Sequence, residues 1–254
     1  MEKKANKIVL KTQKEIEIMV QGGRILARIM GELKKEVSPG IRTKDLEKKA
    51  RELIKKYKAE PAFLGYDNYP AVLCTSVNDV IVHGVPSEYQ LKEGDILSLD
   101  LGIKYKGYYA DMAVTVPVGK VPPEVLRLIK VTKKALKRAI KKTRSGNTIG
   151  DIGNTIQRYV EKRGFSVIKE LCGHGIGKEL HEEPQILNYG KRKTGPKLIP
   201  GMVFCIEPMV SMGSERIKKS EDGFGYRTLD GSLSAHFEHI VAVTKYGRKV
   251  LTLI

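Results

Sequence analysis

The stretch DILSLDLGIKYKGYYADMAVTVPVG, residues 95–119, predicts two β-strands over 96–102 and 109–118, with a turn at 104–107. Alternation places the leucines of the first strand on one face and Asp100 on the other, and in the second strand Asp111 lies opposite the apolar face. A hairpin would therefore bring both carboxylates to the same side of adjacent strands. Neighbouring carboxylates in an apolar sheet repel each other and lose hydration, so they need protons or a cation. We favour a metal ion.

Two more acidic residues lie in apolar runs that resemble strands. Glu207 lies in GMVFCIEPMV (201–210) and Glu238 in SAHFEHIVAV (234–243). Buried acids are almost never unpaired. His174 lies between two glycines, which would let its backbone approach a partner closely. One imidazole and four carboxylates form an oxygen-rich site, which favours Mn, Fe, Co or Zn pairs over a thiolate zinc site.

The stretch LCGHGIGKELHEEP (171–184) around His174 invites two other interpretations, and both fail. A phosphate-binding loop needs Ser or Thr after its Gly-Lys, whereas Glu179 follows Lys178. A helical zinc-protease motif needs a second histidine four residues after the first, and His181 has none there.

The order of the elements suggests two similar halves. We expect helices over 13–35 and 43–58, with Thr43 as the cap of the second, followed by strands over 71–77 and 80–83 and the hairpin. A second set follows: helices over 120–144 and 149–163, then strands over 166–171, 202–209 and 237–244. No linker separates the sets, which predicts a single domain, 1–254, with halves of about 1–120 and 121–254.

Charge is the main compositional feature. The chain has 46 Lys+Arg against 29 Asp+Glu, a net charge of +17, and ten of these basic residues lie in the expected amphipathic helix at 120–144. Two interpretations stay open: a solvated surface, or a face for a polyanion such as RNA. The sequence shows no base-reading motif and no apolar stretch long enough to span a membrane, and the three cysteines are well separated. We expect no export signal. We expect a cytoplasmic monomer.

The motifs together resemble the type I methionine aminopeptidases of the pita-bread metallopeptidase family. NDVIVHGVP (78–86), GDILSLDLGIKYKGYYADMAVT (94–115), CGHGIGKELHEEP (172–184), GMVFCIEPMV (201–210) and SLSAHFEHIVAVT (232–244) follow the family pattern in order. The resemblance extends from about residue 8 to the end of the chain. It implies an α+β pita-bread fold with two pseudo-symmetric halves, an antiparallel sheet and outer helices.

The resemblance also implies a dinuclear centre of two divalent ions, Co, Mn, Fe or Zn. The family's metal ligands fall on Asp100, Asp111, His174, Glu207 and Glu238. Asp111 and Glu238 would bridge the ions, and Glu207 would take a proton from the attacking water, whose pKa the ions lower. His181 would bond the substrate carbonyl and the developing oxyanion, and His83 would lie near the substrate amide and amine.

Two further sets of residues follow from the same resemblance. The methionine pocket falls on Phe63, Tyr66, Tyr69, Cys74 and Phe224. Phe224 stands where many relatives have Trp, Phe63 where bacterial members commonly have Cys, and Leu180 where they have Phe, so the shape of this pocket differs from the family pattern. A monovalent Na or K site falls on Asn78, Val80 and Ser234.

The implied activity is removal of the initiator methionine from peptides and nascent chains whose second residue is small and uncharged. The basic helix would then approach ribosomal RNA, with no membrane or sequence-specific nucleic acid as partner. Three alternatives share this fold or charge. Pro-specific peptidases carry a large extra N-terminal domain, whereas the first expected helix of this chain begins at about residue 13. Catalytically inactive relatives should have lost metal ligands, and all five are present here. A polyanion-binding module would not account for five placed ligands.

Overall fold

The computed structural model describes residues 8–253, in which helices and antiparallel strands alternate in two successive sets. The helices are α1 (Gln13–Glu36), α2 (Thr43–Lys56), α3 (Pro123–Ile140) and α4 (Ile149–Glu161), with a 3-10 turn η1 (Tyr66–Asn68). The strands are β1 (Glu60–Pro61), β2 (Leu73–Val77), β3 (Val80–Val82), β4 (Ile96–Tyr105), β5 (Tyr108–Pro117), β6 (Ser166–Val167), β7 (Cys172–Gly175), β8 (Glu182–Leu187), β9 (Val203–Ile206), β10 (Met209–Ser211), β11 (Ile217–Lys219), β12 (Tyr226–Thr228), β13 (Ser234–His236), β14 (His239–Thr244) and β15 (Gly247–Val250).

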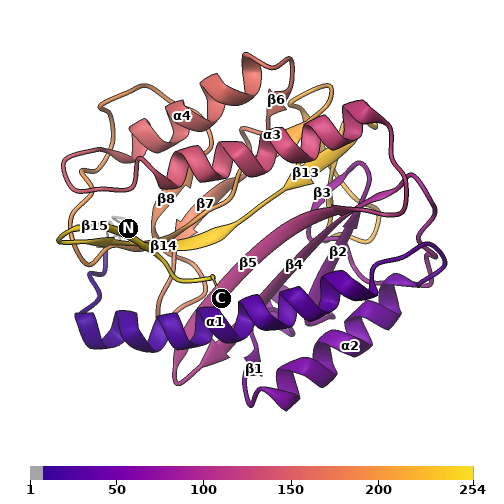
Figure 1. Ribbon diagram of the computed structural model, residues 1–254, viewed down its shortest axis with the longest axis horizontal. Coiled ribbons are helices and arrows are strands. Elements are labelled where there is room, and N and C mark those ends of the chain that lie inside the picture. Colours follow the sequence, from indigo (N-terminus) through magenta and orange to yellow (C-terminus); the bar gives the residue numbers. More distant parts are fainter. Residues whose placement is uncertain (1–7, 254) are drawn as a thin grey trace, which may run out of the picture.

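The strands form antiparallel sheets between two pairs of helices. One sheet has the order β1-β4-β2 with β5 beside β4, and a five-stranded sheet has the order β15-β14-β9-β7-β8. The remaining strands of the described residues form two three-stranded sheets, with the orders β13-β10-β6 and β11-β12-β3. Figure 1 shows α1 and α2 on one side of the strands and α3 and α4 on the other. The expected α+β class is confirmed.

Local capping explains where two of the helices begin. Thr12 accepts a hydrogen bond from the Glu15 amide while Glu15 accepts one from the Thr12 amide, and Thr148 and Asp151 repeat this box at α4. Thr43 was the expected cap of α2, and this is wrong: α2 begins at Thr43 itself. The Thr43 hydroxyl instead bonds the backbone of Ser87, donating at 3.0 Å and accepting at 2.8 Å.

An isolated β-bridge precedes the second helix of each half. An isolated β-bridge joins Arg42 to Gln90 just before α2, and another joins Thr148 to Lys197 just before α4. This repetition agrees with two halves of similar topology. The single domain 1–254 and its division near residue 120 stay predictions. Residues 1–7 and 254 lie outside the described residues, and residues 1–7 include the start of the segment in which we expect no export signal.

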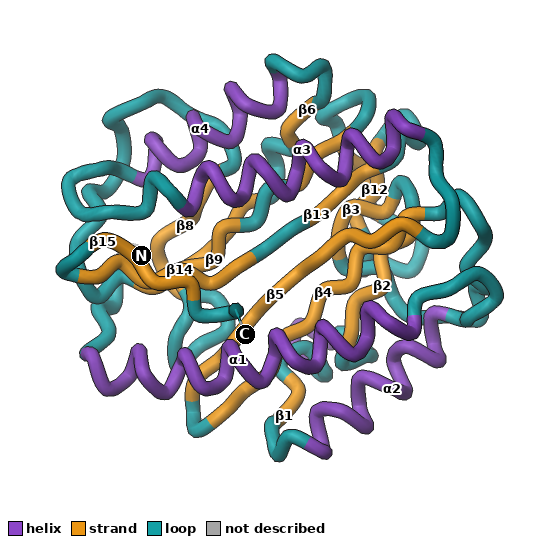
Figure 2. The backbone as a smooth tube through the Cα atoms, in the orientation of Figure 1, coloured by secondary structure: helices purple, strands orange, loops and turns teal. Residues whose placement is uncertain are grey.

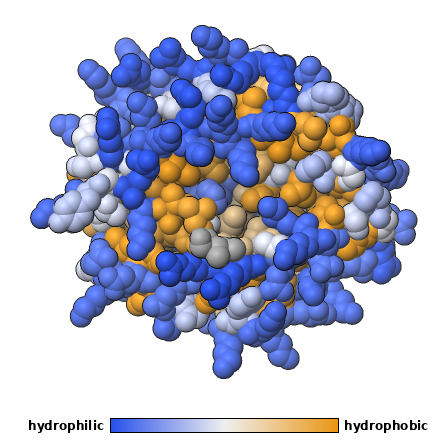
Figure 3. Space-filling model, viewed as in Figure 1, coloured by the Kyte–Doolittle hydropathy of each residue, from blue (hydrophilic) through white to orange (hydrophobic). Residues whose placement is uncertain are grey.

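Several predicted elements are shorter in the structure. The basic helix expected over 120–144 is α3, which begins at Pro123 because the missing N–H of proline costs nothing at the first helical position. Its basic residues are exposed and its apolar residues, apart from Pro123 and Leu126, are buried, as an amphipathic helix requires. The strand expected over 166–171 ends at Val167. Figure 3 shows hydrophilic side chains over the α3–α4 edge of this face.

A helix must be both long and apolar to cross a lipid bilayer. Within residues 8–253, none is both long enough and apolar enough to cross a membrane.

Candidate metal centre and substrate pocket

The β4–β5 hairpin places Asp100 and Asp111 on the same face. Asp100 pairs with Ala113 and Asp111 with Gly102, so the two carboxylates are diagonal neighbours. The opposite face carries apolar pairs such as Leu99 with Val114, which lie in the core. The arrangement expected from alternation is therefore correct, and Asp100 and Asp111 are only 7% and 4% exposed.

Glu207 and Glu238 lie in breaks between strands. The sequence predicts continuous strands over 202–209 and 237–244, but residues 207–208 separate β9 from β10 and residues 237–238 separate β13 from β14. Pro208 has no amide hydrogen to donate to a ladder, which explains the first break. At the second break the Glu238 amide donates to Ala113 of β5 at 2.9 Å. This bond joins the second half of the chain to the first beside β5 (Figure 2).

His174 lies on β7, a strand that the sequence did not predict. A Cβ at Gly173 would lie 2.4 Å from the Cys205 carbonyl oxygen, and one at Gly175 would lie 2.2 Å from the Glu183 carbonyl oxygen. The glycines on either side of His174 are therefore needed because neighbouring backbones pass so close. Nδ1 of His174 bonds the Gly175 carbonyl at 2.9 Å, and Nε2 lies 3.5 Å from Glu207 Oε1.

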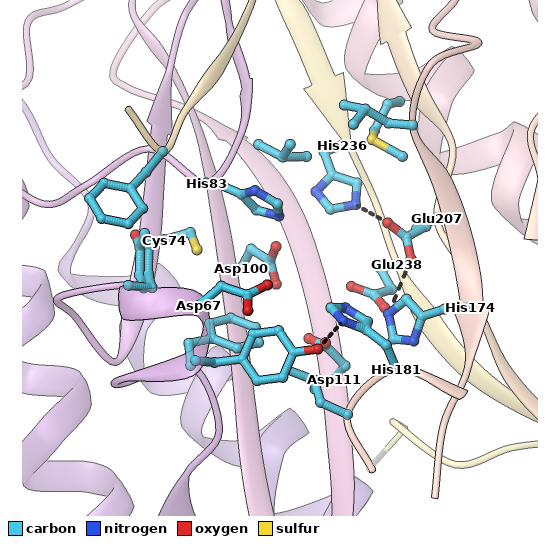
Figure 4. A pocket seen from close by; sticks show the side chains of 18 of the residues that line it. Asp67, Cys74, His83, Asp100, Asp111, His174, His181, Glu207, His236 and Glu238 are labelled. Carbon is cyan, nitrogen blue, oxygen red and sulfur yellow. Dashed lines mark hydrogen bonds and ion pairs between the residues drawn. The ribbon is translucent and has the colours of Figure 1, made fainter. Parts of the chain in front are cut away.

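The five predicted ligands converge from both halves (Figure 4). One oxygen each of Asp100, Asp111 and Glu238 lie within 4.8 Å of one another, and a second group joins Glu238 with His174 and the buried thiol of Cys205. Oxygens of Asp100, Glu207 and Glu238 are buried without a hydrogen-bond partner. Such atoms are costly unless a cation or proton satisfies them, so the donor set fits divalent metal ions.

Burial is the main cause of the pKa shift of each predicted ligand. Burial raises the pKa of Asp100 to about 7. Burial raises the pKa of Asp111 well above its usual range, and the charges of Glu238 and Asp100 add to it. Burial, followed by neighbouring carboxylates, likewise raises the pKa values of Glu207 and Glu238. Burial lowers the pKa of His174 to about 3, so its imidazole is neutral at physiological pH.

A cavity of about 230 Å³ opens beside this cluster, and all twelve predicted metal, catalytic and methionine-pocket residues line it. His181 bonds the Tyr66 hydroxyl through Nδ1 at 2.8 Å and packs edge-on against His174 at 4.3 Å between ring centroids. His83 lies across the cavity from them (Figure 4). Burial in the cavity, with a smaller contribution from His181, lowers the pKa of His83 to about 4.

The other end of the cavity is apolar and aromatic. Tyr69 and Cys74 are buried, and Phe63 and Phe224 pack against them. The ring of Tyr69 meets Phe224 edge-on at 5.6 Å, and its hydroxyl donates to the Gly84 carbonyl at 3.0 Å. Because β2 pairs Cys74 with Asp100, this apolar end directly adjoins the carboxylates.

His236, which the sequence does not single out, also lines the cavity. It is 1% exposed, neither ring nitrogen has a hydrogen-bond partner, and Nε2 lies 3.8 Å from Glu207 Oε2. Burial lowers its pKa to about 3. Its position two residues before Glu238 was the available signal, because alternation gives such residues a common face. Asp67, Leu171, Cys172 and Met209 of the lining were missed as well.

Asn78, Val80 and Ser234 come together outside this cavity. The Ser234 hydroxyl lies 3.3 Å from the Asn78 carbonyl oxygen and 3.2 Å from that of Val80, where β13 meets β3. Two carbonyls and a hydroxyl are a suitable set for a monovalent cation, and this assignment stays a prediction.

Four buried carboxylates and an imidazole that line a cavity with an apolar end fit a metal-dependent hydrolase. The sequence pattern of metallopeptidase family M24 matches residues 17–245, and the chain belongs to this family. The chain is 46% identical to a methionine aminopeptidase of Clostridium perfringens, covering 97% of this chain and 99% of that one, and 44% identical to methionine aminopeptidase 1 of Bacillus subtilis over 97% and 100%.

Solved structures agree with the sequence comparisons. The crystal structure of a methionine aminopeptidase from Thermotoga maritima matches with a TM-score of 0.96 at 44% identity, covering 98% of this chain and 100% of that one. A prolidase from Pyrococcus furiosus matches with a TM-score of 0.79 at 26% identity, but the match covers only 66% of the prolidase. The expected pita-bread fold is confirmed.

Proposed function

We propose that this chain is an aminopeptidase that removes N-terminal methionine from peptides and nascent chains whose second residue is small and uncharged. The observation that carries the proposal is the adjacency of two features in one cavity: the carboxylate cluster at one end and an apolar, aromatic end at the other. Likeness to full-length methionine aminopeptidases supports the substrate. A thioether is soft and apolar, so aromatic rings and a thiol suit it.

Two divalent ions would be held by Asp100, Asp111, His174, Glu207 and Glu238. The ligand types do not select one metal among Co, Mn, Fe and Zn, because the order of affinities and cellular availability also decide. When bound, the ions would lower the pKa of a water molecule towards neutrality and polarise the scissile carbonyl.

The chain's own groups complete the reaction. Glu207, beside His174 and His236, takes the proton of the attacking water. The Tyr66 hydroxyl and Nδ1 of His181 share a hydrogen bond. We assign the hydroxyl as its donor, which leaves the ring proton on Nε2, where it donates to the substrate carbonyl oxygen as negative charge develops there. His83 is neutral at physiological pH because burial lowers its pKa, and it positions the amide at the scissile bond.

Two finer features belong to this proposal. Asn78, Val80 and Ser234, which meet where β13 contacts β3, would hold one Na or K ion. The basic face of α3 docks on ribosomal RNA in the cytoplasm, since its six Lys and Arg side chains between residues 127 and 138 are all exposed. Unchanged ribosome pelleting after these lysines are replaced by Glu would contradict the docking.

Cleavage of three peptides by chelator-stripped protein tests the proposed reaction. We expect Met release from Met-Ala-Ser, but not from Met-Glu-Ser, only after Mn, Co, Fe or Zn is restored. Cleavage of Ala-Pro-Ser would instead assign the chain to the Pro-specific branch that shares this fold. Metal binding without turnover of any peptide would refute the enzyme assignment.

A further inference from the structure

Lys11 is buried just before α1, which is unusual for a lysine. Its side chain is only 3% exposed, and its Nζ donates to the carboxylate of Glu182 and, at 3.0 Å, to the Val9 carbonyl. Its own amide donates to the Gly201 carbonyl at 2.7 Å. The segment before α1 is therefore anchored to the second half of the chain at this residue.

Glu182 directly follows His181, and its carboxylate ties together the loop that carries this histidine. Oε1 accepts hydrogen bonds from the amides of Lys178 at 2.9 Å and Glu179 at 3.3 Å, while Oε2 accepts from Lys11. One carboxylate thus closes the backbone from residue 178 to residue 182, and the ammonium group holds that carboxylate in place from outside the loop.

The loop is wrapped tightly around this pair. A Cβ at Gly177 would lie 2.5 Å from Glu182 Oε1 and 2.5 Å from Cε of Lys11. On its other side the Gly177 carbonyl accepts from the Tyr109 amide at 2.8 Å, close to Asp111. His181 is therefore held by its ring through Tyr66 and by its backbone through Glu182 and Lys11.

We infer that Lys11 is a positioning residue for His181, acting through Glu182; this rests on the proposed function. A buried ion pair adds little stability compared with apolar residues of the same volume, but its geometry restricts how the two charged side chains can be oriented. His181 must donate to an oxygen whose charge develops during the reaction, and small displacements of such a donor are costly. The strap that Lys11 forms across the loop supplies that constraint from a segment that contributes none of the predicted metal ligands.

Steady-state kinetics on Met-Ala-Ser tests the inference with Lys11→Met, Glu182→Gln, the double variant and Lys11→Arg. The control is Lys14→Met, an identical change at an exposed position three residues away. We expect kcat to fall by about 10- to 100-fold in Lys11→Met, with KM and metal affinity close to wild-type values. The double variant should be no worse than either single one, and Lys11→Arg should restore most of the rate. Amide exchange at Lys178 and Glu179 should accelerate.

The outcomes separate the possible roles. Wild-type kcat in folded Lys11→Met would overturn the inference, as would a parallel loss of kcat, metal affinity and folded protein, which marks a merely structural role. If Lys11→Met does not fold, the double variant carries the test, because it leaves no unpaired buried charge; a wild-type kcat there would overturn the inference. Wild-type protein without activity on Met-Ala-Ser would refute the proposed function itself.

Discussion

Metal affinity should rise steeply with pH between 6 and 8, because cations and protons compete for the carboxylate cluster. Burial raises the pKa of Asp100 from an ordinary 3.8 to about 7 in the folded protein. The folded state therefore keeps this proton up to about pH 7, and the stability that it contributes is fully present below the ordinary pKa of 3.8 and is lost progressively as pH rises from there to about 7. A divalent ion must displace the proton below pH 7 and meets a free carboxylate above it.

The size of the effect follows from that one pKa. At pH 6 the carboxyl group is about nine-tenths protonated, and displacing its proton costs about 1.4 kcal/mol more than at pH 8, which is about tenfold in affinity. Asp111, Glu207 and Glu238 also have raised pKa values, so tenfold is a lower bound. His174, with a pKa of about 3, adds no slope in this range.

Calorimetric titration of chelator-stripped protein with Mn²⁺ measures both quantities. Runs at pH 6 in buffers of different ionisation enthalpy should show release of about one proton or more per protein. Asp100→Asn should bind more weakly and release fewer protons, whereas Asp45→Asn, on α2 and remote from the cluster, should behave as wild type. Equal affinity at pH 6 and pH 8 in the wild-type protein would refute the reasoning.

Three further changes separate folding from chemistry. His181→Ala should lower kcat by about 10²- to 10³-fold with metal affinity intact, since it removes the proposed donor to the oxyanion but none of the predicted ligands; parallel loss of metal in calorimetry would argue otherwise. Gly175→Ala should destabilise the fold by about 1–3 kcal/mol in urea, because its Cβ meets the Glu183 carbonyl oxygen at 2.2 Å. Thr115→Val should cost about 1–3 kcal/mol by the same assay, since its hydroxyl exchanges hydrogen bonds with the His236 backbone at 2.8 Å in each direction; an unchanged midpoint would exclude that contribution.

The features that the sequence predicted correctly depend on short-range signals. Residues alternate with period two along the hairpin, so the common face of Asp100 and Asp111 could be derived without a structure. Acidic residues in apolar runs mark positions that need a partner, which singled out Glu207 and Glu238. The helices were found because apolar residues recur at helical spacing over more than three turns.

The missed features depend on contacts between distant segments. The strand β7 is glycine-rich and has no alternation of its own; it is a strand because it pairs with β8 and β9. The contact between Tyr66 and His181 joins residues 115 positions apart, and Lys11 and Glu182 are 171 apart. No local pattern encodes which of many charged residues will meet.

The sequence by itself thus determined the two sets of elements, the class of site and the identity of its candidate ligands, because those depend on local periodicity and on acids placed in apolar runs. Only the tertiary structure decided that these ligands lie within reach of one another, that His236 joins them, and that Lys11 reaches the His181 loop. The physical reason is that the centre forms where the break at Glu238 docks on β5, and that contact exists only when both halves are folded.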